Sequence, residues 1–109
     1  MTTVILVDAA EEQLDEIVEW WRTHREASPT LVVDEFDRCV SLLESSPDAG
    51  ARFHRSRVPG VRRVVMRRTK HHVYYLHDEP NAVVYILAVW GAPKAGYPVL
   101  LDPRERSGP

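Results

Sequence analysis

Apolar residues in the first half of the chain recur at steps of three and four, which is the period of a helix with one buried face. A short β-branched run, Thr3–Val7, precedes them and predicts a strand. The first helix is expected over Asp8–Glu26, where Asp8 and Glu11 have the spacing of a capping box. The second is expected over Pro29–Ser46, because proline suits a first helical turn. Two helices joined by so short a link form an antiparallel hairpin.

The second half has the pattern of strands. Three runs rich in valine, tyrosine and isoleucine are separated by short polar turns, and they cover Val61–Arg68, His72–His77 and Ala82–Trp90. Consecutive strands with turns this short pair antiparallel. We therefore predict an α+β domain of order β-α-α-β-β-β, in which the helical hairpin packs on one face of a small antiparallel sheet. The domain is assigned to residues 1–98, and residues 99–109 to a polar, flexible tail.

Charge is divided unevenly along the 109 residues, although the net charge is only −2. Residues 1–50 hold 12 Asp and Glu against 3 Lys and Arg, whereas residues 51–109 hold 4 against 11. No carboxylate lies between Arg52 and His72. Such a basic block is typical of a surface for nucleic acid or for an acidic protein. The alternative is that the acidic half folds back on the block and neutralises it.

The composition also excludes several classes of protein. No apolar run approaches the roughly 20 residues that span a bilayer, and the N-terminus lacks the pattern of a signal peptide. The single cysteine, Cys39, cannot form an intrachain disulfide or a cysteine-based zinc site. His71 and His72 point to opposite faces of a strand and cannot share a metal ion. We expect no metal, no cofactor and a cytoplasmic location.

Alternation along the basic strand separates its cations by face. Val64 and Met66 are expected under the helices, which leaves Arg63, Val65 and Arg67 on the open face. For any single arginine, a merely solvated position explains the pattern equally well. As a group, the cations favour a binding surface made by Arg55, Arg57, Arg63, Arg67 and His72.

Three segments, taken in order, carry a family resemblance: AAEEQLDEIVEWW, LLESSPDAG and PGVRRVVMRRTKHHVYYLHDEPNAVVYILAVWGAP. Leu43, Pro47 and Gly50 match an L-x-x-x-P-x-x-G ending of the second helix, and Gly60 and Arg62 match a G-x-R element before a strand. Over nearly the whole domain, the chain resembles the RelE/ParE superfamily of toxins from bacterial type II toxin–antitoxin modules. The resemblance implies the fold predicted above.

Two activities are implied by this resemblance. RelE-like members cut mRNA in the ribosomal A site, and on that interpretation the catalytic residues would be Arg63, Arg67, His72 and Tyr97. ParE-like members lack that catalytic set and poison DNA gyrase. The ParE-like alternative is favoured, because Val65 stands where a RelE-like strand carries lysine, His72 where it carries arginine, and Gly91 where a polar residue often follows the last strand. The slightly acidic chain also lacks the overall basicity typical of RNA binding.

The resemblance further implies a protein partner. A cognate antitoxin would wrap an acidic, flexible segment around the toxin and fold on binding. We expect the antitoxin or the cellular target to contact Arg55, Arg57, Arg62, Arg63, Arg67, Arg68, His72, Trp90 and Lys94. A non-toxic module of the same fold, which only binds a partner, is the alternative from another functional class.

Overall fold

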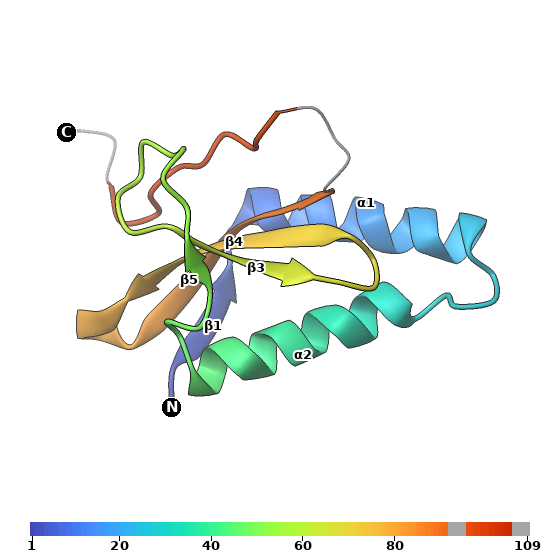
Figure 1. The fold of residues 1–109 in the computed structure, drawn as a ribbon, viewed down its shortest axis with the longest axis horizontal. Helices are drawn as coiled ribbons and strands as arrows, with labels where there is room; N and C mark the ends of the chain where they lie inside the picture. The colour runs from blue at the N-terminus through green and yellow to red at the C-terminus, as the bar shows by residue number, and fades with distance from the viewer. Residues whose placement is uncertain (92–95, 106–109) are drawn as a thin grey trace.

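The structure, a computed structural model, describes residues 1–91 and 96–105 as two helices packed on a five-stranded sheet (Figure 1). In chain order the elements are β1 (Thr3–Leu6), α1 (Asp8–His24), α2 (Leu31–Ser45), β2 (Ala51–Arg52), β3 (Arg62–Met66), β4 (His71–Asp78), the 3-10 turn η1 (Glu79–Asn81) and β5 (Val83–Gly91). The predicted α+β fold with a helical hairpin is confirmed, and the basic loop contributes one additional short strand, β2. Neither described helix is long and apolar enough to cross a bilayer.

The sheet is mixed, whereas the sequence predicts an antiparallel one. Its strand order is β1-β5-β4-β3-β2, and neighbours from β2 to β5 are antiparallel. Strand β1 instead runs parallel to β5, with Thr3 beside Val83 and Leu6 beside Ile86. Short turns enforce antiparallel pairing only between the strands that they join. Because two helices separate β1 from the other strands, a parallel neighbour is sterically allowed.

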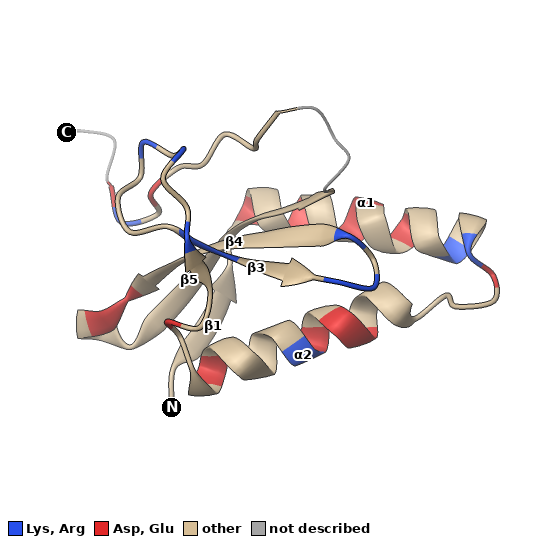
Figure 2. Cartoon of the chain, viewed as in Figure 1, with Lys and Arg blue, Asp and Glu red and all other residues tan. Residues whose placement is uncertain are grey.

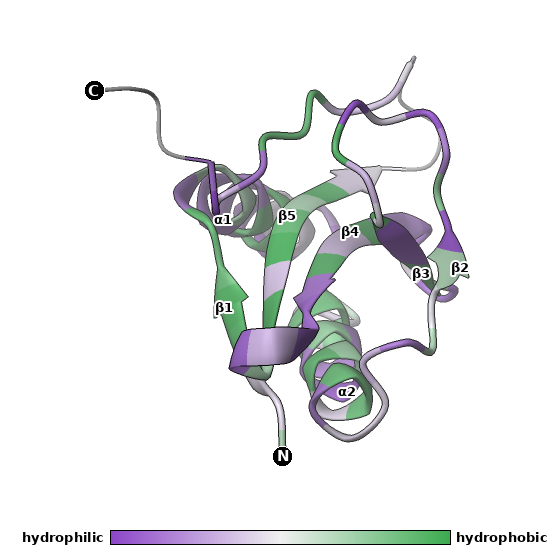
Figure 3. Cartoon of the chain, turned by 90° about the vertical axis from the view of Figure 1, so that its left-hand side faces the viewer, coloured by the Kyte–Doolittle hydropathy of each residue, from purple (hydrophilic) through white to green (hydrophobic). Residues whose placement is uncertain are grey.

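One face of the sheet packs on the helices. Strands β4 and β5 lie in the middle of the fold (Figure 3), and their buried side chains include Val73, Tyr75, Val84 and Ile86. Helix α2 contributes Val32, Phe36, Cys39 and Leu43 to this core, whereas Ala10 is the one fully buried residue of α1. Trp21 of α1 is half-buried at the edge of the cluster. Burial raises the pKa of the Cys39 thiol to about 11, so this cysteine is an inert core residue.

A β-bulge in β5 rearranges the two faces of the sheet. Tyr74 pairs with Ala88 while the next residue, Tyr75, pairs with Ile86, so Leu87 is the extra residue. Leu87 and Ala88 therefore both belong to a second core on the face turned away from the helices. We call this second face of the sheet the open face, because neither described helix covers it.

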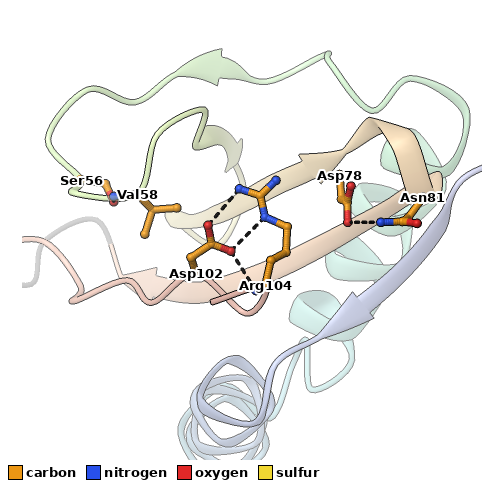
Figure 4. A network of polar contacts seen from close by, with 6 residues as sticks. All are labelled: Ser56, Val58, Asp78, Asn81, Asp102 and Arg104. Atoms are coloured by element: carbon orange, nitrogen blue, oxygen red, sulfur yellow. Dashed lines mark hydrogen bonds and ion pairs between the residues drawn. The ribbon is translucent and has the colours of Figure 1, made fainter. Parts of the chain in front are cut away.

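The loop after β2 and part of the C-terminal segment cover the second core. Phe53, Val58 and Val61 come from the loop, and Leu100, which is 8% exposed, comes from the region assigned to the tail. Arg104 binds Asp102 through Nε and Nη2 at 3.0 and 2.9 Å, close to Asp78 of β4 (Figure 4). Leu100, an apolar residue in a segment expected to be a polar tail, thus packs on the sheet. The division into a domain of 1–98 and a flexible tail stays a prediction.

Acidic and basic residues lie mostly on different elements of the fold. Most Asp and Glu side chains lie on α1 and α2, while the cations gather on the loop after β2, on β3 and on the β3–β4 turn (Figure 2). The acidic half of the chain therefore covers the helix side of the sheet. Its carboxylates meet the basic block at Glu35, beside the β3–β4 turn, and at Asp48, beside Arg62. Among the described residues, Arg55, Arg57 and Arg63 form no ion pair with this acidic half.

Candidate target-binding surface

The open face carries arginines stacked on aromatic rings. The guanidinium of Arg63 lies 5.5 Å from the Phe53 ring and 6.0 Å from the Tyr74 ring. Arg55 lies 5.2 Å from the ring of Tyr97, which itself contacts Phe53 at 5.3 Å. These distances are those of cation–π contacts. We call Phe53, Arg55, Arg63, Tyr74 and Tyr97 the cation–aromatic cluster.

Strand pairing explains why the cluster forms. Arg63 of β3 lies directly opposite Tyr74 of β4, and Val65 lies opposite His72. Residues that face each other across antiparallel strands are close neighbours on one face of the sheet. The His72 ring meets Tyr74 edge-on at 6.2 Å, which joins it to the cluster. The expected positions of Arg63 and Val65 on the open face agree with the structure.

His72 is held mainly in its neutral form. Burial lowers its pKa below the usual 6.5, and the nearby Arg63 charge lowers it further. At neutral pH the ring therefore has one N–H donor and one nitrogen that can accept a hydrogen bond or a proton. This state suits recognition or general base chemistry.

Trp90 neighbours His72 on β5, where the two residues are paired across the strands. It is half-buried against the second core, together with Tyr85. Arg57 is exposed in the loop after β2, and with Arg55 it lines a groove of about 560 Å³ beside Tyr97 and Leu101. Lys94, another expected binding residue, lies outside the described residues.

Arg62 occupies a structural position. Its Nη1 donates a hydrogen bond to the Gly50 carbonyl at 2.8 Å, and its Nε lies 3.7 Å from the Asp48 carboxylate. His77 binds the same carboxylate at 3.0 Å. Arg62 therefore ties the segment after α2 to the sheet, and its side chain lies apart from the cation–aromatic cluster.

Arg67 and Arg68 are not on the strand, contrary to the alternation expected from the sequence. Strand β3 ends at Met66, and Glu35 of α2 accepts hydrogen bonds from the backbone N–H groups of Arg68 and Thr69 at 2.8 and 3.0 Å. Arg67 lines a shallow hollow with residues of α2 instead of joining Arg63 on the open face. The hydrogen bonds to Glu35 fix the turn, so the alternation of side chains between the two faces of the sheet ends at Met66.

The proposed ribonuclease residues are only partly brought together. Arg63 and His72 share the open face, but Tyr97 reaches them only through Phe53 and Tyr74. Arg67 lies at the turn. Among residues 1–91 and 96–105, no hydrogen bond joins any two of these four side chains, and no group of three His, Cys, Asp or Glu could hold a metal ion.

Phe53 and Tyr74 organise the surface, and the sequence did not identify them. They pack edge-on at 4.8 Å and place a ring under Arg63. The one available signal was an isolated aromatic residue, Phe53, inside an otherwise polar and basic loop. A buried aromatic anchor of this kind explains how an irregular loop holds its cations in place.

Comparison with known proteins supports the expected family. Residues 4–94 match the family model described as the ParE toxin of the type II toxin–antitoxin system, parDE. Among solved structures, the chromosomal ParDE toxin–antitoxin system of P. aeruginosa is similar, with a TM-score of 0.66 and 21% identity, covering 84% of this chain and 96% of that one. No curated protein sequence matches the chain.

Two RelE structures share the fold as well. The intact RelBE toxin–antitoxin complex of E. coli matches with a TM-score of 0.57 and 15% identity, covering 86% of this chain and 100% of that one. The isolated RelE toxin of E. coli gives the same TM-score and identity, covering 87% and 88%. At these identities the structural matches establish the fold alone.

Proposed function

This chain belongs to the ParE toxin family of type II toxin–antitoxin systems, and on that premise we propose that it arrests growth by inhibiting DNA gyrase. The family assignment confirms the resemblance inferred from sequence. We place its action in the cytoplasm, where gyrase works. The chain would act by binding, with the cation–aromatic cluster as its recognition surface.

The proposal rests on two arginines of the open face that lie over aromatic rings and form no ion pair within the described residues. Arg55 and Arg63 lie over aromatic rings, and neither forms an ion pair with a described carboxylate. Their charge remains available to a partner, while the rings restrict their movement. Preorganised arginine beside aromatic residues is the composition typical of protein interfaces.

The same surface gives less support to catalysis. Cleavage of RNA needs a general acid for the leaving oxygen. His72 is mainly neutral at neutral pH, and Tyr97 is linked to Arg63 and His72 only through the rings of Phe53 and Tyr74. Arg63 beside His72 is nevertheless the one feature that favours the RelE-like alternative, because it pairs a cation with a potential base.

We further propose that a cognate antitoxin neutralises the chain. Its binding segment would be acidic, because the surface formed by β3, the β3–β4 turn and the loop after β2 is basic. A segment that orders only on binding suits a partner that proteolysis must remove. Isolated toxin is then expected to be less stable than its complex.

Two parallel reactions with the purified chain test the proposal. One follows supercoiling and cleavage-complex formation by DNA gyrase, and the other maps cuts in mRNA on programmed ribosomes. Gyrase inhibition with intact mRNA is the expected result. Codon-positioned cuts in mRNA would assign the RelE-like activity instead, and inactivity in both reactions together with unchanged growth on expression would favour a non-toxic binding module.

A further inference from the structure

The segment Tyr97–Leu101 has the side-chain pattern of a strand without a pairing partner. Pro98 and Leu100 are buried, whereas the alternate residues Tyr97, Val99 and Leu101 are 47%, 89% and 77% exposed. Within the described ranges, no backbone group of this segment forms a hydrogen bond with another backbone group. Three large side chains therefore line the outside of the molecule, beside backbone groups that pair with no other described backbone group.

Grooves flank this ridge on both sides. The groove of about 560 Å³ separates it from Arg55 and Arg57 of the loop after β2. A second groove of about 210 Å³, lined by Val7, Ala9 and Leu87, separates it from the start of α1. Exposed apolar patches of this kind mark interaction sites on soluble proteins. The ridge and its grooves form a continuous surface that a single extended segment could follow.

We propose that the ridge Tyr97–Val99–Leu101 is a docking strand for an extended, acidic segment of a partner protein. Such a segment would pair with the free backbone groups of 97–101 and place alternate apolar side chains in the flanking grooves. Its carboxylates would meet Arg55 and Arg57. In the toxin proposed above, this occupant is the neutralising partner, and to that extent the inference rests on the proposed function.

The charges beside the ridge favour an acidic partner segment. Arg55 and Arg57 are both exposed on one side of the ridge, and the nearby Asp102 carboxylate is held by Arg104 at 2.9 Å. Hydrogen bonds from Arg104 lower the pKa of Asp102, so this carboxylate is ionised and already engaged. A second copy of the chain would bring like charges together along the groove. An acidic segment gains attraction at the same positions.

The ridge fits a protein better than a single-stranded nucleic acid. Bases need aromatic faces on which to stack. Tyr97 is the only exposed aromatic residue of the ridge, and Arg55 and Phe53 already lie against its ring. Val99 and Leu101 offer aliphatic surface, which suits the side chains of a peptide strand.

Binding of a short synthetic peptide of alternating valine and glutamate tests this inference. We expect saturable binding to the full chain, slower amide exchange across 97–101, and no binding of the matched peptide with lysine in place of glutamate. The double variant Val99→Ser/Leu101→Ser, which changes two exposed side chains, should weaken binding about tenfold. Val33→Ser, an exposed apolar position on α2, is the matched control and should bind normally.

Each contrary outcome is informative. Absence of peptide binding, or equal binding by the ridge variant and the control, would overturn the docking strand. Tighter binding of oligothymidylate that is lost in the same ridge variant would assign the surface to nucleic acid. The gyrase and ribosome reactions use no peptide, so a failure of the proposed function would appear there and leave this measurement unaffected.

Discussion

The hydroxyl of Tyr75 accepts a hydrogen bond from the backbone N–H of Gly50 at 2.8 Å, across 25 residues of sequence. Arg62 donates to the carbonyl of the same glycine at 2.8 Å. Both backbone groups of Gly50 are thus bound by side chains of the sheet. This relationship gives a physical reason for the glycine that closes the LLESSPDAG segment, and it fixes the exit of α2 against β3 and β4.

Substitution of Tyr75 by phenylalanine should destabilise the fold by about 1–3 kcal/mol, because it leaves a buried N–H without its acceptor. Urea unfolding of the two proteins measures the difference. Tyr74→Phe is the control: its ring is equally buried in the same strand, and its hydroxyl has no hydrogen bond within the described residues. An equal decrease in the free energy of unfolding of the two variants would contradict a stabilising role of the Tyr75 hydroxyl.

Gly50→Ala should cost about 1–3 kcal/mol through overpacking. A Cβ there would lie 2.8 Å from Cε1 and the hydroxyl oxygen of Tyr75 and 2.9 Å from the Arg63 carbonyl oxygen. The last of these is backbone and cannot rotate away. Thermal unfolding compares this variant with Ala49→Ser, an exposed neighbour, and an unchanged melting temperature for Gly50→Ala would show that the segment has more room than the contacts imply.

Glu35→Ala should release the β3–β4 turn and cost about 1–2 kcal/mol, a value kept small because the carboxylate is partly exposed. Burial alone would raise the pKa of Glu35, but hydrogen bonds from Thr69 and Arg68 outweigh burial and lower it from 4.5. The contribution of ionised Glu35 to the free energy of unfolding is therefore present above about pH 4.5, and it is lost as the pH falls through the lowered pKa of Glu35. Denaturant unfolding as a function of pH should show this loss in the parent chain and in Glu26→Ala, but not in Glu35→Ala.

Arg63→Gln should raise the pKa of His72 toward its usual value, while burial still keeps it below 6.5. Because folding lowers this pKa, the unfolded chain binds more protons near pH 6, and stability falls as pH falls through that range. Proton NMR titration of the His72 ring measures the shift directly. Arg67→Gln serves as the matched control, since Arg67 lies at the turn, and a shift of equal size there would show that distant charge controls His72.

The hydrophobic pattern predicted the helices, the antiparallel strands and the positions of Arg63 and Val65, because these depend on periodicity within single elements. It failed at Arg67, because the next two residues, Arg68 and Thr69, donate backbone hydrogen bonds to Glu35, more than 30 residues earlier, and the strand ends at Met66. The expected capping box also does not form: Val7 is the N-cap residue, and Asp8 lies already inside α1. Strand β1 runs directly into the helix and leaves no turn for a side-chain cap.

The candidate surface was only half predictable. Its cations follow from the basic block, but the aromatic rings that hold them depend on pairing between β3 and β4 and on a loop folded back over the sheet. Arg62 shows the same limit, because only the position of Gly50 and Asp48 makes it structural. Charge can be counted along a sequence. Which charges remain free depends on tertiary contacts.

Titration of DNA gyrase with the purified chain and with a double variant, Arg55→Gln/Arg63→Gln, tests whether the cation–aromatic cluster binds gyrase. We expect the parent chain to inhibit supercoiling, and the double variant to need at least about tenfold more protein for the same inhibition, because it has lost arginines that anchor the interface. The control is Arg38→Gln, an exposed arginine on α2, which should inhibit like the parent. Equal inhibition by all three proteins, or none by the parent, would contradict the claim that the cation–aromatic cluster recognises gyrase.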